Sequence, residues 1–170
     1  ALPIDNINTR AQIITVSGTV TDSFDTPAFI FIKTDKGYSN TYTISSAGVF
    51  SGTVSFTLQG YHTITVSCTD NIGNSAFDTI IIIYNSDSPV VNIALPIDNT
   101  STRAQIITVS GTVTDSFDTP AFIFIKTDKG YSNTHSISSA GVFSGTVSFT
   151  LQGYHTITIS CTDNIGNSAF

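Results

Sequence analysis

The stretch GVFSGTVSFTLQGYHTITVSCTDNIGN, residues 48–74, decides the fold. Apolar and polar residues alternate over residues 50–58 and again over residues 62–69. A period of two is typical of strands that bury one face, whereas a helix repeats every 3.6 residues. We therefore expect two half-buried strands with these residues facing inward: Phe50, Val54, Phe56, Leu58, Ile64, Val66 and Cys68.

The pattern in the rest of the repeat also predicts strands, separated by turn residues such as Asp25-Thr26-Pro27 and Asp35-Lys36-Gly37. No stretch shows a period of 3.6. Frequent short strands with turn signals between them predict an all-β sandwich of immunoglobulin type. The expected strands are residues 90–94, 12–21, 28–34, 40–45, 49–58, 61–70 and 78–84.

The chain repeats itself. Residues 1–77 recur as residues 94–170 with five differences, and the intervening segment completes a 93-residue period. We expect two tandem immunoglobulin-like domains, residues 1–86 and 87–170, joined stiffly through the short Asn85–Pro89 segment. The first residue falls inside a repeat and the second repeat stops before its last strand. We favour a window on a longer array over the alternative, in which a neighbouring chain donates the last strand.

Composition excludes several classes of protein. Only 11% of the residues are charged, the net charge is −6, and six Lys and Arg are spread over both repeats. This argues against nucleic-acid binding and against a basic membrane-binding patch. The apolar run Ile80–Tyr84 is too short to span a bilayer.

Four short motifs resemble the bacterial Ig-like repeats found in tandem on secreted and surface proteins. They are VSGTVTD in the second strand, Gly48 with Phe50, Leu58 with Gly60, and the run from Ile64 to Asn74. The resemblance covers nearly the whole of each repeat, and it implies an extracellular or cell-surface location. Such repeats serve as stalks, spacers, adhesion modules and accessory domains of glycosidases. His62 and Cys68 depart from the family pattern.

The sequence shows no catalytic constellation that both repeats share, so we expect no enzymatic activity. Cys68 and Cys161 are predicted to be buried small residues, with an inter-chain disulfide or an accessible thiol as the alternatives. His62 and His155 follow a glycine at the start of a strand, where a corner hydrogen bond is expected. No His or Cys cluster has the spacing of metal ligands.

Each repeat contains a loop rich in side-chain oxygens. Asp70, Asn71 and Asn74, with Asp163 in the second repeat, are calcium candidates, because hard cations take Asp and Asn oxygens. With so few carboxylates per loop we favour the other interpretation, in which these side chains hydrogen-bond their own turn. No cofactor is expected beyond that calcium alternative. Asn99-Thr100-Ser101 matches a glycosylation acceptor, for which chance is the better account.

Two predicted strands are apolar on both faces, which suggests either cover by neighbouring segments or packing against another copy. The candidate assembly face consists of Phe29, Ile30, Phe31, Ile32, Ile80, Ile81, Ile82 and Ile83. The expected function is a structural repeat, a stalk, filament or surface-lattice element, whose partners are further copies of itself and which can self-associate laterally. The alternative is an adhesin that binds a glycan or a protein, with Tyr38 and Tyr42 as its candidate aromatics.

Overall fold

A computed structural model describes residues 3–25 and 27–170. The chain divides into two compact units, the first ending at Ser86 and the second beginning at Asp87. Among the described residues there are only strands, turns and irregular segments, with no helix. Accordingly, nothing in this part of the chain qualifies as a long apolar helix of the kind that crosses a membrane.

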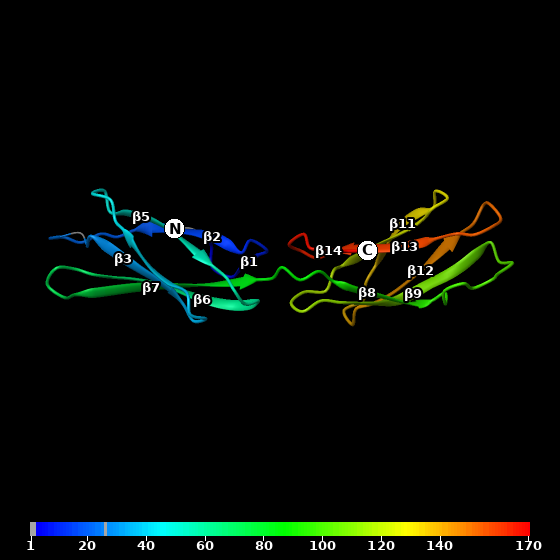
Figure 1. Ribbon diagram of the computed structural model, residues 1–170, viewed down its shortest axis with the longest axis horizontal. Coiled ribbons are helices and arrows are strands. Elements are labelled where there is room, and N and C mark those ends of the chain that lie inside the picture. Colours follow the sequence, from blue (N-terminus) through cyan, green and yellow to red (C-terminus); the bar gives the residue numbers. More distant parts are fainter. Residues whose placement is uncertain (1–2, 26) are drawn as a thin grey trace. The chain divides into compact units, whose positions relative to one another are not determined.

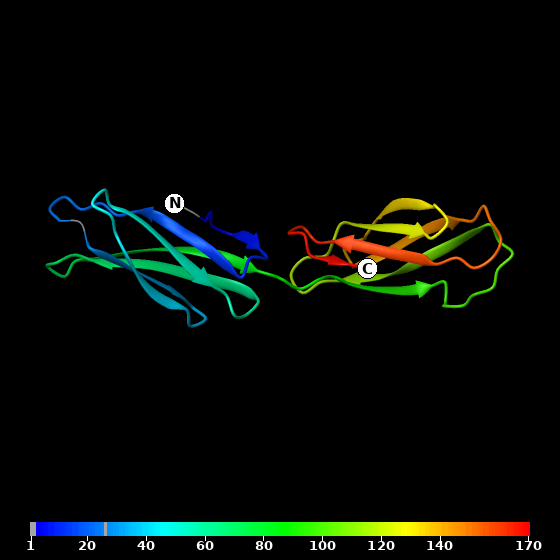
Figure 2. The same ribbon diagram turned by 45° about the horizontal axis from the view of Figure 1, so that its top comes forward.

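Unit 1 contains two sheets, which form opposite layers of the unit (Figures 1 and 2). The larger sheet has the order β1-β7-β6-β3-β4, and the smaller sheet pairs β2 with β5. All pairs are antiparallel except β1 with β7, which is parallel. The strands are β1 Ile7–Thr9, β2 Ile13–Thr19, β3 Phe29–Thr34, β4 Ser39–Thr43, β5 Val49–Ser55, β6 Gly60–Thr69 and β7 Ser75–Tyr84.

The core of unit 1 lies between these sheets because alternate residues of each strand point inward. In β3, for example, Ile30 and Ile32 are buried while Phe29 and Phe31 are exposed. Each fully buried Ile or Val contributes about 1.5–3 kcal/mol from removal of apolar surface from water. The buried cluster is Val16, Ile30, Ile32, Phe50, Val54, Phe56, Ile64, Ile82 and Tyr84.

Unit 2 also contains two sheets, in the orders β11-β10-β13-β14 and β12-β9-β8. Its buried cluster includes Val109, Ile125 and Phe143, the counterparts of core residues in unit 1. The strands are β8 Val90–Leu95, β9 Ile106–Thr114, β10 Phe122–Thr127, β11 Ser132–Ser136, β12 Val142–Ser148, β13 Ile157–Thr162 and β14 Ser168–Ala169.

The two units differ at their first and last strands. In unit 2, β8 pairs with β9, whereas the segment equivalent to β1, residues 100–102, is not a strand. In unit 1, β1 pairs with the ten-residue β7. Strand β14, Ser168–Ala169, corresponds to the first two residues of β7, and the sequence ends at Phe170.

The predicted all-β class and immunoglobulin-like sandwich are confirmed. One inward assignment is wrong, because Leu58 is 57% exposed. The reason is that β5 ends at Ser55, so the alternation of the strand does not extend to residue 58. Strand β1 was not expected from the sequence.

Candidate functional site

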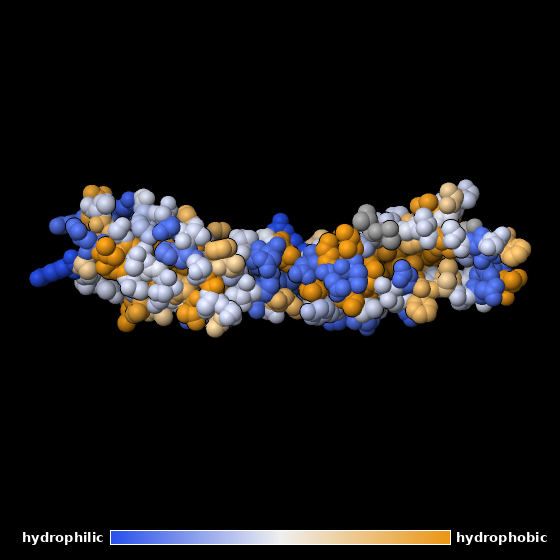
Figure 3. Space-filling view, turned by 180° about the vertical axis from the view of Figure 1, so that it is seen from behind, coloured by the Kyte–Doolittle hydropathy of each residue, from blue (hydrophilic) through white to orange (hydrophobic). Residues whose placement is uncertain are grey.

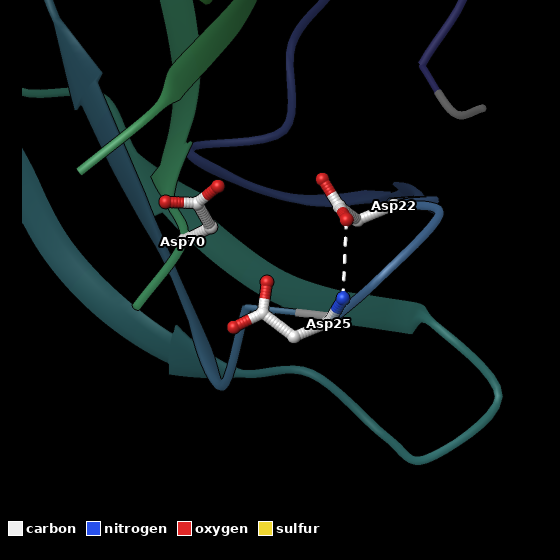
Figure 4. A group of neighbouring side chains, drawn as sticks. All are labelled: Asp22, Asp25 and Asp70. Carbon is white, nitrogen blue, oxygen red and sulfur yellow. Dashed lines mark hydrogen bonds between the residues drawn. The ribbon is translucent and has the colours of Figure 1, made fainter. Parts of the chain in front are cut away.

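Three aspartates gather at one end of unit 1. Asp22 and Asp25 follow β2, and Asp70 follows β6, so segments far apart in the sequence meet here. One carboxylate oxygen from each lies within 4.8 Å of the others, and the side chains approach one another in Figure 4. Carboxylate oxygens are the ligands that hard cations such as Ca²⁺ prefer.

Hydrogen bonds within the loops already engage much of this oxygen set. Asp70 accepts from the backbone N–H groups of Ile72 at 3.0 Å and Asn74 at 2.7 Å, and from Asn74 Nδ2 at 2.7 Å. Burial acts to raise the pKa of Asp70, but these hydrogen bonds outweigh it and hold the pKa below its ordinary value. The turn hydrogen bonding expected from the sequence is therefore present, with Gly73 at a φ of 95°.

The other two aspartates have partners as well. Asp22 Oδ1 accepts from the backbone N–H groups of Phe24 at 2.8 Å and of Asp25 at 3.1 Å. Asp25 Oδ2 accepts from Asn71 Nδ2 at 2.6 Å. Asn71 thus ties the loop after β6 to the loop before β3, and the cluster fastens two loops together.

Unit 2 repeats the cluster in a more enclosed form, with Asp115, Asp118 and Asp163. Asp163 is 6% exposed, whereas its counterpart Asp70 is half-buried. Asp118 Oδ1 is buried and has no hydrogen-bond partner among the described residues. The carboxylate oxygens of this cluster are ligands of the kind that a hard cation binds. Asp163 is engaged by its own turn, so Asp115 and Asp118 would supply the further ligands.

The two cysteines differ in exposure. Cys161 is 5% exposed, and burial together with the nearby charge of Asp115 raises the pKa of its thiol. Cys68 is only half-buried. Both thiols are free, one in each unit.

His62 and His155 both make the corner hydrogen bond that the sequence predicts. His62 Nε2 lies 2.7 Å from the carbonyl oxygen of Leu58, and His155 Nε2 lies 2.8 Å from that of Leu151. His155 Nδ1 is 3.9 Å from Asp128, and Ser148 lines the same small cavity, a set reminiscent of nucleophilic catalysis. The Nε2 atom must donate to a carbonyl, however, so it is not available to take a proton from a serine.

A tyrosine pair in unit 1 was not expected from the sequence. The Tyr38 and Tyr42 hydroxyls lie 2.7 Å apart, and both donate to the carbonyl oxygen of Thr53. Gly52 lies directly beneath, and a Cβ there would come within 2.6 Å of the Tyr42 ring, so the ring requires glycine at this position. Both tyrosines are half-buried and pack against the core, so they are not the exposed aromatics that an adhesin would need.

The candidate assembly residues divide between two faces. Ile30, Ile32 and Ile82 lie in the core. Phe29, Phe31 and Ile81 are 57%, 40% and 37% exposed on the outer face of the larger sheet. In the register of this sheet, Phe31 and Phe77 lie on either side of Ser67.

Apolar side chains therefore flank a row of Ser and Thr side chains on β6. We name this surface of the larger sheet the outer face; it includes Phe29, Phe31, Ser67, Phe77 and Ile81. Phe122 and Phe124 hold the equivalent positions in unit 2, at 60% and 40% exposure. Figure 3 shows apolar patches interspersed with hydrophilic surface on one side of the molecule. The glycosylation candidate Asn99 is exposed in a turn, with a φ of 60°.

A scan of protein-family models finds no match to this sequence, and a search of curated proteins also finds none. Several solved structures are similar in fold. One holds fibronectin(III)-like modules of Clostridium thermocellum CbhA, with 13% identity, a TM-score of 0.47, and cover of 99% of this chain and 86% of that one.

Two further structures come from adhesion proteins. A tetra-tandem repeat from the extending region of a large adhesion protein has 27% identity, a TM-score of 0.40 and cover of 92% of this chain. A Ca²⁺-stabilised adhesin with which an Antarctic bacterium binds ice has 19% identity, a TM-score of 0.47 and cover of 96%. This chain spans 43% of each of those two chains. The structures that it resembles are thus fibronectin-III-like modules and repeats of adhesion proteins.

Proposed function

We propose that this chain is a structural tandem segment of a long extracellular or cell-surface protein, serving as a stalk, filament or surface-lattice element. The observation that supports this best is the repetition, in which 72 of 77 paired positions are identical. Each copy builds a unit with its own core. Near-identical copies add length and equivalent contacts, which a scaffold uses and a single catalytic site does not.

The arrangement of the polar side chains supports a non-catalytic role. His155 Nε2 donates to the Leu151 carbonyl, so this nitrogen cannot accept a proton from Ser148, and the aspartate clusters fasten loops together. Within residues 3–25 and 27–170, no other set resembles a catalytic centre that both units share. We therefore propose that the chain has no enzymatic activity of its own.

The scaffold proposal is tested on native material. Antibodies against this segment, applied to intact cells and to purified surface fractions in electron microscopy, should label fibres or a lattice outside the cell. Labelling confined to the cell interior contradicts the proposal. Copies of the repeat should also recur along the labelled structure, because two units provide little reach on their own.

Lateral self-association is proposed to use the outer face. The double variant Phe31→Asp and Phe124→Asp adds one charge to this face in each unit, at side chains that are 40% exposed. We expect it to abolish concentration-dependent association in analytical ultracentrifugation and to leave the far-UV circular dichroism unchanged. Thr15→Asp with Thr108→Asp is the matched control, because it adds the same charges to exposed positions on the other sheet. Equal loss in both variants, or no loss in either, contradicts this assignment.

The alternative is an adhesin-type module for a glycan or protein ligand. The exposed aromatics Phe29 and Phe31 are the residues that favour it, since Tyr38 and Tyr42 are engaged with Thr53. A glycan array probed with the intact chain distinguishes the two functions. Saturable binding that the Phe31→Asp variant loses supports the adhesin and not the scaffold alone.

A further inference from the structure

In each unit, two edge strands from different sheets lie next to one another. In unit 1, β4 is at an edge of the larger sheet and β5 is at an edge of the smaller one, and in unit 2 these places belong to β11 and β12. An isolated bridge between Ile44 and Phe50 joins the two edges just beyond β4. An edge strand presents unpaired main-chain groups, to which a strand of another molecule can pair. Near-identical units increase this risk, because each copy offers the same edge to the next.

Strands β4 and β11 lack the usual protection of an edge strand. Their sequences, SNTYT and SNTHS, contain neither Lys nor Pro. Each strand pairs with its neighbour in a continuous register without a bulge. Lys, Pro and bulges are common means by which natural proteins keep edges from pairing. Any protection of these two edges therefore comes from other side chains.

The register shows which main-chain groups of β4 face away from the sheet. Just beyond the strand, the Ile44 N–H donates to the Ala28 carbonyl of the segment before β3. Hydrogen-bonded and non-bonded positions alternate along an antiparallel pair. The even-numbered residues of β4 therefore bond to β3, and the N–H of Thr41 points toward the open edge. The same pattern in unit 2 turns the N–H of Thr134 outward.

A side chain caps each of these two outward N–H groups. Asn40 Oδ1 accepts from the Thr41 N–H at 2.9 Å, and Asn133 Oδ1 accepts from the Thr134 N–H at 2.8 Å. A donor that already bonds to its own chain is not available to a strand from another molecule. The recurrence of the cap in both units shows that it belongs to the repeat.

The carbonyl of Thr53, on the neighbouring edge of β5, is occupied in a similar way. The register with β2 turns the main-chain groups of the odd-numbered residues of β5 away from β2. The Tyr38 and Tyr42 hydroxyls both donate to this outward carbonyl. Asn40 Nδ2 in turn donates to the Tyr42 hydroxyl at 3.4 Å. One network of side chains thus engages a donor on β4 and an acceptor on β5.

Unit 2 keeps both ends of this network but not its centre. The Tyr131 hydroxyl donates to the Thr146 carbonyl, as Tyr38 donates to the Thr53 carbonyl in unit 1. His135 replaces Tyr42, and its buried Nε2 has no hydrogen-bond partner among the described residues. The β11 edge is therefore protected by fewer bonds than the β4 edge, and removal of its cap should have the larger effect.

We propose that Asn133, like Asn40 in unit 1, prevents strand pairing between copies of this chain at the open edge. The excluded occupant is β11 of a second copy, placed antiparallel about a two-fold axis with Thr134 opposite Thr134. That arrangement needs the N–H group of Thr134 in both copies, and the Asn133 side chains occupy these groups. His135 is the one titratable residue of β11, so little like-charge repulsion opposes the approach of two such strands.

The test uses the intact chain with Phe31→Asp and Phe124→Asp. This background removes the outer face from the comparison, so the result does not depend on whether that face associates. Addition of Asn133→Ala frees the Thr134 N–H. In sedimentation velocity ultracentrifugation, we expect a dissociation constant at least about tenfold lower than in the background, since the paired edges gain one main-chain hydrogen bond from each copy.

Two further variants serve as controls. Asn92→Ala makes the same exchange at an exposed position of β8, an edge strand of the other sheet, and should leave association unchanged. Thr134→Pro, added to Asn133→Ala, removes the freed donor at a position that does not bond to β10, and should abolish the gain. An equal gain in Asn92→Ala, a gain that persists with Thr134→Pro, or no gain in Asn133→Ala overturns the proposal. A gain accompanied by loss of the far-UV circular dichroism spectrum also overturns it, because unfolded chains then cause the association.

Discussion

Ile82→Ala should destabilise unit 1 far more than Ile81→Ala does, although the two residues are adjacent in β7. Ile82 is 0% exposed in the core, and Ile81 is 37% exposed on the outer face. Truncation of a buried Ile costs about 2–5 kcal/mol, because apolar contacts are lost and a cavity remains. At the exposed position, the lower strand preference of Ala costs about 1 kcal/mol or less. The expected difference of about 1–4 kcal/mol is substantial beside the roughly 5–15 kcal/mol typical of a domain.

Amide exchange measured by NMR on the intact chain provides the assay, with unit 2 as the internal reference. Core amides of β6 should exchange about 5- to 700-fold faster in Ile82→Ala than in Ile81→Ala, since about 1.4 kcal/mol corresponds to a tenfold change. Both variants replace Ile by Ala in the same strand, so the two positions differ in burial and not in the residues exchanged. Equal losses in the two variants would refute the assignment of inward and outward faces in β7.

Other predictions concern the tyrosine pair, the aspartate loop and the thiols. Tyr42→Phe removes the hydroxyl that donates to the Thr53 carbonyl and should lower the stability of unit 1 by about 0.5–1.5 kcal/mol in urea unfolding; a stability equal to the parent's would contradict the role given to this bond. The pKa of Asp70 is depressed in the folded state, so its contribution to stability is present above its ordinary pKa of 3.8 and is lost as the pH falls through the lower, folded-state pKa. Thermal melts from pH 5 to pH 2 should therefore show a steeper loss for the parent than for Asp70→Asn, and parallel curves would count against this. A chromogenic disulfide reagent should modify Cys68 several-fold faster than Cys161 under native conditions, because burial and Asp115 keep the Cys161 thiol protonated; the reverse order would exclude that explanation.

The sequence predicts the fold well wherever alternation continues along a whole strand. Val54, Phe56 and Ile64 are buried as the alternation predicts. Alternation does not predict burial beyond the end of a strand, and Leu58, which follows the end of β5, is an example. Parity has meaning only while the backbone stays extended, and the sequence alone does not mark that end sharply.

Features set by distant partners could not be predicted from local pattern. Strand β1 contains a single apolar residue, Ile7, and pairs with β7 some 75 residues later in the sequence. The sequence pointed to Asp70 and Asp163 but not to Asp22 and Asp25. The available signal was a pair of aspartates directly after a strand, in a loop that must reach the end of the sandwich where β6 also ends.

The parallel pairing of β1 with β7 determines how unit 1 responds to a mechanical load. Tension applied between Pro3 and Asn85 pulls these two strands in opposite directions along their length, because β1 follows Pro3 and β7 precedes Asn85. The bonds from Asn6 N–H to the Ile81 carbonyl, at 2.8 Å, and from Asn85 N–H to the Thr9 carbonyl, at 2.9 Å, then lie across the direction of shear. Bonds loaded in this way must rupture together, whereas those of a hairpin pulled from one end open in succession. Unit 1 thus resists extension through a clamp of a few main-chain bonds, and its strength depends on their simultaneous failure.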